Sequence, residues 1–572
     1  MWNLWKKEER RFVFVSGAFA ILTALLPFCV FPLTAQTQKW VAFDSFTYTG
    51  VDKVHKTAIP MSGDYYNPIL AGFYPDPSIC RVDQDYYLVN STFAYFPGIP
   101  VFHSRDLVNW NQVGNVIHRP GQLRYDGLGV SRGIFAPAIA HHAGIFYVVC
   151  TMVDGGGNFV VTAADPAGPW SDPVYLRFEG IDPSLFFDDD GRAWMVNNGA
   201  PDETPLYNGH RAIWIQEFDP VEKKMTGPRK VIVNGGVDIS VKPIWIEGPH
   251  IYKRDEWYYL CSAEGGTGPG HSQVVFRSKN VDGPYAPWNR NPILTQRDLD
   301  PNVPYAVTCT GHADLVIGPD GKWWAVFLGV RPYDGDASPM GRETFLLPVA
   351  WTDDNWPLIL PPGERVPLTG KSPGGVMVRR SAALPLNGSF TWTDDFSAGE
   401  LSQAWIMFRA PKETWWKIIP SSGKLELMPR PETLTGKGNP SYLARRIQHA
   451  VFTVSVNMEI PEDPGVSAGL AVFQSEQFHY FLAVRREEEK THIYLERVRN
   501  GVTEQMGSAV LPKTDRISLS VETDSEKCSF RYATEDGAWK ILAVNADARM
   551  LTTAVAGGFV GATVGPHVRV DP

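Results

Sequence analysis

A carboxylate lies between two prolines in the segment Gly72-Phe73-Tyr74-Pro75-Asp76-Pro77-Ser78-Ile79. Each proline fixes its own φ near about −65° and restricts the residue before it, so a stiff backbone is expected to aim the Asp76 side chain. A strand-like run over residues 79–82 follows, then an acidic turn over residues 83–85, and then the aromatic pair Tyr86-Tyr87. Taken alone, Asp-Pro-Ser is far more typical of an Asx-turn or a strand start than of a catalytic base.

The same arrangement recurs four more times along the chain. Each unit has a mark residue, a strand-like run, a polar turn, and an aromatic residue or pair 10 to 12 positions after the mark. The marks are Asp76, Ala136, Asp182, Glu247 and His312, and the aromatic residues are Tyr86-Tyr87, Phe146-Tyr147, Trp194, Trp257-Tyr258 and Trp323-Trp324. Successive marks are 60, 46, 65 and 65 residues apart, a period typical of propeller blades. We therefore predict an all-β fold with a five-bladed β-propeller over residues 60–360.

The five marks are expected to converge, because the innermost strand of each propeller blade starts near the central axis. A blade start can carry Asp simply as a turn residue, and His312 can equally be read as a core histidine. Three of the five marks are carboxylates, however, and burying like charges together is costly unless they have a function. The pattern therefore favours a functional site on the axis.

The bulk composition sets the outer limits. With 572 residues the chain is too long for one core, so at least two domains are expected. A formal net charge of −9 argues against a nucleic-acid partner, which would require a basic face. After Cys29, the cysteines are Cys80, Cys150, Cys261, Cys309 and Cys528, an odd and scattered set that predicts neither a disulfide framework nor a zinc site.

The N-terminus reads as a targeting segment. Four basic residues lie before an apolar run over residues 12–33, and Thr34-Ala35 precedes a polar stretch. This order is typical of a secretory signal peptide, which we predict over residues 1–35. Export to the periplasm or the extracellular space follows, with no stable membrane association once the signal is removed. An uncleaved anchor and lipidation at Cys29 remain as alternatives.

Several segments together resemble glycoside hydrolase family 43, within it the β-xylosidase and α-L-arabinofuranosidase group. They include residues 67–81, 91–93, 96–100 and 103–110, together with Asp182-Pro183-Ser184-Leu185-Phe186, Ile246-Glu247-Gly248-Pro249-His250, Gly311-His312-Ala313-Asp314 and Gly341-Arg342-Glu343-Thr344-Phe345. The resemblance runs through the whole predicted propeller.

The resemblance implies a role for each matching position. Asp76 falls at the general base, Glu247 at the general acid, and Asp182 at the residue that orients the acid and tunes its pKa. Phe93 and Arg342 match substrate-contacting positions, and His312 matches the axial histidine near the sugar. Phe135 stands where many relatives have Trp, which leaves the choice between xylose and arabinose open.

The C-terminal region has a different character. A connector rich in Pro, Gly and Ser leads to alternating stretches such as Phe452-Thr453-Val454-Ser455-Val456, which are typical of a two-sheet sandwich. We predict a linker over residues 361–392 and a β-sandwich over residues 393–572, of the jelly-roll, concanavalin-like type that the family group carries. The resemblance implies that a loop over residues 558–561 reaches the pocket, with Phe559 at its tip.

These observations predict an exo-acting, inverting glycosidase that removes terminal β-D-xylose, α-L-arabinofuranose or both from plant cell-wall oligosaccharides. An inverting enzyme needs a carboxylate base and a protonated acid about 6.5–9.5 Å apart, with a water between them. An endo-acting arabinanase or xylanase and a propeller lectin are the rival readings. No cofactor is required; a structural Ca²⁺ near His312 and a homo-oligomer are left open.

Overall fold

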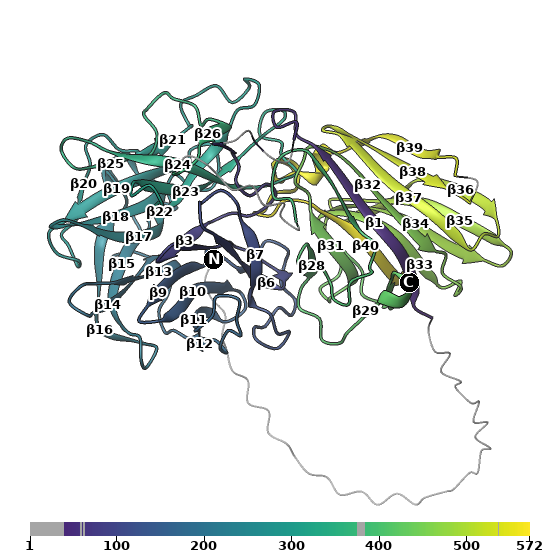
Figure 1. The fold of residues 1–572 in the computed structure, drawn as a ribbon, viewed down its shortest axis with the longest axis horizontal. Coiled ribbons are helices and arrows are strands. Elements are labelled where there is room, and N and C mark those ends of the chain that lie inside the picture. Colours follow the sequence, from purple (N-terminus) through teal and green to yellow (C-terminus); the bar gives the residue numbers. More distant parts are fainter. Residues whose placement is uncertain (1–38, 58–59, 61–62, 375–383, 536, 572) are drawn as a thin grey trace, which may run out of the picture. The chain divides into compact units, whose positions relative to one another are not determined.

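The computed structural model describes residues 39–57, 60, 63–374, 384–535 and 537–571. The signal peptide expected over residues 1–35 lies outside these residues. The described chain is nearly all β-structure, as predicted, and its strands form a five-bladed propeller and a two-sheet sandwich (Figure 1). None of its described helices is both long enough and apolar enough to span a bilayer.

Each blade is a small antiparallel sheet whose strands follow one another in the sequence. Blade 1 contains β3 (Ser78–Val82), β4 (Asp85–Val89), β6 (Gly98–Ser104) and β7 (Asn111–Ile117), and blade 2 contains β9 (Ala138–His142), β10 (Ile145–Val153), β11 (Gly157–Ala163) and β12 (Val174–Tyr175), with β8 (Gly133–Ile134) beside β10. Blade 3 contains β13 (Ile181–Phe187), β14 (Ala193–Gly199), β15 (Ala212–Asp219) and β16 (Lys224–Asn234), and blade 4 contains β17 (Glu247–Arg254), β18 (Trp257–Glu264), β19 (Ser272–Ser278) and β20 (Ala286–Pro287), with β21 (Leu294–Thr295) beside β19. Blade 5 contains β22 (Thr308–Ile317), β23 (Trp323–Val330), β24 (Glu343–Trp351) and β25 (Pro357–Leu358).

The sequence repeat corresponds to the inner hairpin of every blade. The aromatic residues after each mark lie at or next to the start of the second strand, and the polar turns before them join the first strand to the second. Ala143 and Gly144 both have positive φ, 48° and 79°, as a tight two-residue hairpin turn requires. The spacing of about ten residues is therefore one strand plus one turn.

The ring is closed by residues from the two ends of the propeller. Strand β2 (Asp64–Tyr66) pairs with β26 (Thr369–Lys371), and Leu70 bridges Thr344 of the last blade. The buried Asn67 amide donates to the Leu346 carbonyl at 2.9 Å and accepts from the Leu346 N–H at 2.9 Å. Blade 1 is thereby fastened to blade 5.

The sandwich contains two eight-stranded antiparallel sheets, and one of its strands comes from the N-terminal end of the described chain. The first sheet has β1 (Val41–Val51), β27 (Phe390–Asp394), β29 (Trp416–Ile419), β30 (Lys424–Leu427), β32 (Val451–Glu459), β37 (Arg516–Asp524), β38 (Lys527–Ala533) and β39 (Lys540–Asp547). The second has β5 (Tyr95–Phe96), β28 (Trp405–Phe408), β31 (Ser441–Arg446), β33 (Val466–Ser475), β34 (Phe478–Glu487), β35 (Lys490–Arg499), β36 (Val502–Pro512) and β40 (Thr563–Val570). Figure 1 shows β1 in purple beside β32 of the sandwich.

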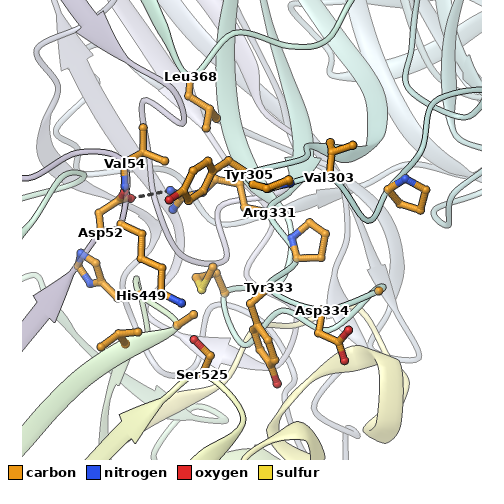
Figure 2. Close-up of a pocket in the computed structure, with 18 of the residues that line it drawn as sticks. Asp52, Val54, Val303, Tyr305, Arg331, Tyr333, Asp334, Leu368, His449 and Ser525 are labelled. Atoms are coloured by element: carbon orange, nitrogen blue, oxygen red, sulfur yellow. Dashed lines mark hydrogen bonds and ion pairs between the residues drawn. The ribbon is translucent and has the colours of Figure 1, made fainter.

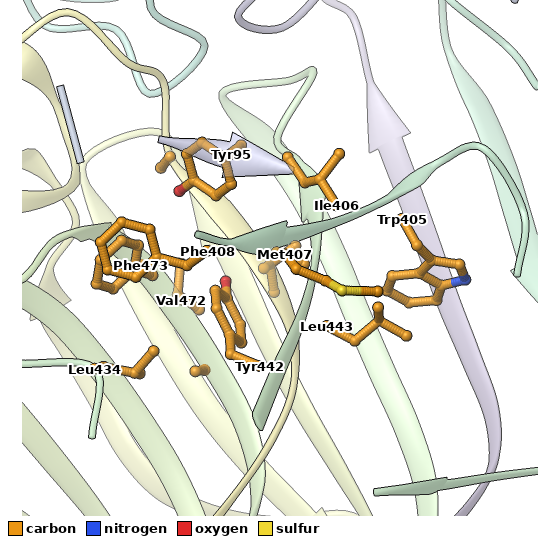
Figure 3. Packing of buried hydrophobic residues seen from close by; sticks show 14 of the residues in the cluster. Tyr95, Trp405, Ile406, Met407, Phe408, Leu434, Tyr442, Leu443, Val472 and Phe473 are labelled. Atoms are coloured by element: carbon orange, nitrogen blue, oxygen red, sulfur yellow. The ribbon is translucent and has the colours of Figure 1, made fainter. Parts of the chain in front are cut away.

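One hydrophobic core runs from the first two blades into the sandwich. Strand β5 lies between β4 and β6 in the chain, yet it pairs with β28 of the sandwich. Figure 3 shows Tyr95 of β5 near Phe408 and Tyr442, and the Tyr95 and Phe408 ring centroids are 5.9 Å apart. Arg409 is buried at the same junction, where its Nε donates to the Leu128 carbonyl at 2.7 Å. The propeller therefore relies on the sandwich for part of its core.

Candidate active site

The axial residues come together as the repeat predicts. A small cavity is lined by four of the five marks, Asp76, Ala136, Asp182 and His312. At the fifth mark the lining residue is Gly248, which directly follows Glu247. Asp76, Asp182 and His312 have φ of 51°, 53° and 52°, and the β13 and β22 ladders shift register beside their marks. A residue before proline is normally extended, so the positive φ of Asp76 and Asp182 differs from what the proline rule predicts. Backbone held in this region is typical of functional sites.

Asp76 is a buried carboxylate with several donors. Its Oδ1 accepts from Arg342 Nη1 at 2.9 Å, and its Oδ2 accepts from the Ser91 hydroxyl at 2.6 Å. Burial by itself raises the pKa of Asp76, but the Arg342 charge, His312 and the Ser91 hydrogen bond outweigh it and leave the pKa lowered. Asp76 is therefore ionised at neutral pH.

Glu247 lies in the opposite environment. It is buried, and no hydrogen bond or ion pair joins its carboxyl group to another described side chain. Burial raises its pKa well above the ordinary value, and the negative charges of Asp182 and Asp76 raise it further. Glu247 therefore holds a proton under conditions in which Asp76 has lost its own.

The third carboxyl group, that of Asp182, also has a raised pKa. Its Oδ2 accepts a hydrogen bond from the Gly248 backbone N–H at 3.3 Å, which ties it to the residue after Glu247. Burial, followed by the charge of Asp76, raises the pKa of Asp182 to about 7. Asp182 and Glu247 thus form a buried acidic pair in which the charge of Asp182 opposes ionisation of Glu247.

An aromatic wall stands beside the carboxylates. The Phe93 ring centroid is 5.5 Å from that of Phe135 and 6.1 Å from that of Phe559, and the Phe135 and Phe559 centroids are 5.8 Å apart. The Arg342 guanidinium carbon is 5.9 Å from the Phe93 centroid and 5.7 Å from the Phe559 centroid. Four of the five side chains expected around the sugar, those of Phe93, Phe135, Arg342 and Phe559, are therefore neighbours.

The Phe559 segment of the sandwich is held against the propeller by backbone contacts. The Phe559 N–H donates to the Ser131 hydroxyl at 2.9 Å, and the Ala562 N–H donates to the Pro339 carbonyl at 2.8 Å. A Cβ on Gly341 would lie 2.7 Å from the Gly561 nitrogen, so the two chains approach too closely for any side chain. This contact lies directly before Arg342.

His312 packs on the axis as a neutral ring. Its Nδ1 is 3.9 Å from Asp76 Oδ1, and burial lowers its pKa to about 4. A Cβ on Gly248 would lie 2.8 Å from the ring, so glycine is required at that position. Among the described residues, no group of three or more His, Cys, Asp or Glu side chains is arranged to hold a metal ion.

Sequence reasoning missed some members of the cluster. His271, fully buried, has Nδ1 3.0 Å from the Cys309 carbonyl, and its neighbourhood includes Asp76 and Arg342, whose charges act on its pKa. Ser91 belongs to the motif over residues 91–93, which does not indicate that its hydroxyl donates to Asp76. Neither residue type recurs at a fixed offset through the five units, so the repeat gives no signal for them.

Glu343, the neighbour of Arg342, belongs to a separate buried ion-pair cluster. Arg331 donates to Glu343 at 2.7 and 2.9 Å and to Asp52 at 2.7 Å, and the Gly72 N–H donates to Glu343 Oε1 at 3.1 Å. Figure 2 shows the Asp52–Arg331 pair in the wall of a cavity of about 430 Å³. No candidate site residue lines this cavity, and the hydrogen bond from Gly72 ties the cluster to the segment that leads to Asp76.

Comparison with known proteins gives a consistent result. Residues 65–357 match Glycosyl hydrolases family 43, and residues 393–568 match the Beta xylosidase C-terminal Concanavalin A-like domain. A xylosidase/arabinosidase of Butyrivibrio fibrisolvens is 39% identical over 505 residues, covering 87% of this chain and 94% of the relative. A non-reducing end α-L-arabinofuranosidase of Bacteroides ovatus is 35% identical, covering 88% and 91%.

Solved structures extend the likeness to three dimensions. A family 43 subfamily 12 protein retrieved from the capybara gut metagenome is 42% identical with a TM-score of 0.87, covering 92% of this chain and 99% of its own. A xylan β-1,4-xylosidase of Bacillus halodurans is 32% identical with a TM-score of 0.77, covering 88% and 97%. The chain therefore belongs to glycosyl hydrolase family 43 and is a glycosidase, with a five-bladed catalytic propeller and a concanavalin-like sandwich.

Proposed function

We propose that the protein is an exo-acting, inverting glycosidase that removes terminal β-D-xylose, α-L-arabinofuranose or both from xylan, arabinoxylan or arabinan side chains. The observation that carries the proposal is the opposite behaviour of two buried carboxyl groups in one site. The pKa of Asp76 is lowered, whereas that of Glu247 is raised. One group is thus ready to accept a proton while the other is ready to donate one.

The two groups divide the reaction between them. Asp76 takes a proton from a water molecule as that water attacks the anomeric carbon. Glu247 gives its proton to the glycosidic oxygen as the bond to the leaving sugar breaks. The new bond forms on the face opposite to the leaving group, so the product has the inverted configuration. Arg342 donates to sugar hydroxyls and holds Asp76 ionised, and Phe93 and Phe135 supply apolar ring faces.

Asp182 contributes to catalysis through Glu247. Burial is the largest cause of the raised pKa of Glu247, and the negative charge of Asp182 is the next. The role that the resemblance implies for Asp182 is therefore supported as an addition to burial rather than as a replacement for it. The hydrogen bond from Gly248 also orients Asp182 toward the strand that carries the acid.

The position of Phe559 supports attack at chain ends. Its segment packs against residues 339–341 and against Ser131, beside the aromatic wall, where it would obstruct one end of an open groove. Incubation with a xylo- or arabino-oligosaccharide ladder tests this point. Loss of single sugars is expected, and random cuts in mid-chain would favour an endo-acting arabinanase or xylanase.

The stereochemical outcome and the enzyme class are tested together. Proton NMR of early product from an aryl β-xyloside or aryl α-L-arabinofuranoside should show the anomer opposite to that of the substrate. Retention of configuration contradicts the assigned roles. No turnover of any of these substrates, with binding of the sugars retained, would favour the lectin reading.

The proposed chemistry requires no metal ion. Calcium normally takes six to eight oxygen ligands, whereas among the described carboxylates only that of Asp76 is in close contact with the His312 ring, at 3.9 Å, and the proposed reaction uses it. This scarcity of carboxylate oxygens supports the proposal that no Ca²⁺ is needed there. Turnover and melting temperature should be unchanged after treatment with EDTA.

The cellular location rests on the N-terminal sequence. We propose export to the periplasm or the extracellular space after cleavage near Ala35, on the basis of the basic residues and the apolar run that precede it. Sequencing the N-terminus of the protein recovered from the producing cell tests this proposal. A retained N-terminus would instead favour the membrane anchor.

A further inference from the structure

Trp245 occupies an unusual backbone position two residues before Glu247. Its φ is 54°, a region in which a bulky side chain is rare and which is typical of functional sites. Its N–H donates to the Gly209 carbonyl at 2.9 Å. The Trp245 ring is only partly buried, so it presents apolar surface next to the proposed acid.

The segment that holds Trp245 is braced by the loop between β14 and β15. The Tyr207 hydroxyl donates to the Pro243 carbonyl at 2.8 Å. A Cβ on Gly209 would lie 3.0 Å from the Ile244 side chain, so the two segments are in van der Waals contact. The ring of Trp245 is therefore carried by two mutually supporting segments.

Arg211 lies over this ring without a protein acceptor of its own. Its guanidinium carbon is 4.3 Å from the Trp245 ring centroid. No hydrogen bond or ion pair joins the guanidinium to any side chain or carbonyl in the described part of the chain. In contrast, Arg342 donates to Asp76, and Arg229, which also lies over a tryptophan, donates to the Glu179 carbonyl at 3.2 Å. The N–H donors of the Arg211 guanidinium are therefore not used by any acceptor in the described part of the chain.

The pair lies on the side of the site where the acid acts. Trp245 is separated from Glu247 by one residue, and the positive charge of Arg211 acts against the raised pKa of Glu247. A general acid donates its proton to the oxygen of the departing group, so that group must lie on the acid's side of the scissile bond.

We infer that Arg211 and Trp245 form the subsite that binds the departing sugar of the oligosaccharide. Trp245 offers an apolar ring surface to the sugar, and Arg211 donates hydrogen bonds to its hydroxyls. The inference rests on the proposed function, because it takes Glu247 as the acid. It adds a binding site for the sugar that remains with the chain after the terminal unit is removed.

The test compares two substrates with the same terminal sugar. Xylobiose has a sugar leaving group, whereas 4-nitrophenyl β-D-xyloside has an aryl leaving group with no hydroxyls for Arg211. If the enzyme hydrolyses an aryl α-L-arabinofuranoside faster than the aryl xyloside, the two test substrates are α-1,5-arabinobiose and 4-nitrophenyl α-L-arabinofuranoside instead. Arg211→Gln should lower kcat/KM for the disaccharide roughly 10- to 100-fold, the scale of a lost charged hydrogen bond, and leave the aryl value nearly unchanged. Trp245→Ala should act in the same direction.

Arg254→Gln is the matched control. Arg254 lies over Trp351 at 4.1 Å, at the far end of the same strand β17 that begins with Glu247. This variant should leave the ratio of the two kcat/KM values unchanged. If Trp245→Ala does not fold, as judged by its melting curve, Arg211→Gln alone decides the question.

Two outcomes would overturn the inference. One is an unchanged ratio of the two kcat/KM values in Arg211→Gln, and the other is an equal fall for both substrates. Failure of the proposed function is distinguishable from either, because the unmodified enzyme would then hydrolyse neither substrate.

Discussion

Two clusters of buried acidic groups in the described part of the chain differ in how their charges are balanced. At the junction with the sandwich, one guanidinium, that of Arg331, bonds both Asp52 and Glu343 at 2.7 to 2.9 Å. Backbone N–H groups complete the set, since Val54 and His55 both donate to Asp52 Oδ1 at 2.8 Å. Burial raises the pKa of Glu343, but its two bonds to Arg331 identify an ion pair.

On the propeller axis the arrangement is less complete. Arg342 bonds only Asp76, while Asp182 has one long backbone hydrogen bond and Glu247 has no partner among the described side chains. Burial raises the pKa of both groups, and negative charge raises it further, that of Asp76 acting on Asp182 and those of Asp182 and Asp76 acting on Glu247. The first cluster pairs its charges, as a structural ion pair does, whereas in the proposed mechanism the second keeps a proton available for transfer.

Removing either principal carboxyl group of the axis is expected to have the largest effect. Asp76→Asn should lower kcat by about 10²- to 10⁴-fold or more at every pH, because no other group activates the water. Glu247→Gln should lower kcat by a similar factor on oligosaccharides and by less on aryl glycosides, whose leaving group needs no proton. The melting temperature of Glu247→Gln should equal or exceed that of the unmodified enzyme, since a carboxyl group that resists ionisation is lost. A large fall in melting temperature for Glu247→Gln would mean that this axial carboxyl group also serves structure.

Removing the cation of the other cluster should affect stability instead. Arg331→Met leaves Glu343 and Asp52 buried without a counter-charge, which is expected to cost about 3–5 kcal/mol. Differential scanning calorimetry should show a lowered melting temperature, with the turnover of the folded enzyme retained. The control is Arg105→Met, because the Arg105 side chain is 72% exposed and pairs with Asp85 at the surface, where solvent screening leaves a salt bridge with little effect on stability. An equal fall in melting temperature for the two variants would contradict the structural role of Arg331.

A smaller effect is expected at the contact between the sandwich and the aromatic wall. Phe559→Ala removes one ring of the wall and its face toward Arg342, so kcat/KM should fall by roughly tenfold, on the scale of one lost aromatic contact. The melting temperature should change little, because Phe559 is only partly buried. An unchanged kcat/KM would show that the sandwich braces the propeller without shaping the sugar pocket.

The sequence predicted those parts of the fold that repeat. Five marks with an aromatic residue at a nearly constant offset correspond to one strand and one turn in each blade, so the axial position of Asp76 and Glu247 followed from spacing alone. Strand β1 was missed because it stands outside the repeat and pairs with β32, which begins some 400 residues later in the chain. Its apolar alternation is also interrupted by a register shift between Phe43 and Ser45.

Other features depend on contacts that a single sequence does not reveal. The Arg331 cluster joins Asp52, Glu343 and Gly72, residues that share no period and no motif. The positive φ of Asp76 and Asp182 runs against the local preference before proline and is imposed by the axis of the fold. The roles of Phe93, Phe135, Arg342 and Phe559 came only from family resemblance, which correctly placed them together.

The most direct test is the pH dependence of kcat/KM for the unmodified enzyme and for Asp182→Asn. In the proposed mechanism Glu247 must be protonated, so activity should be lost as the pH rises through the raised pKa of that residue. Asp182→Asn keeps the shape of the side chain but removes its negative charge, which is the second-largest cause of the raised pKa of Glu247 after burial. The alkaline limb should therefore move to lower pH by on the order of one unit, and burial should keep it above that of a free Glu. An alkaline limb that stays in place would contradict the account, because Asp182 would then be only the first residue of a blade.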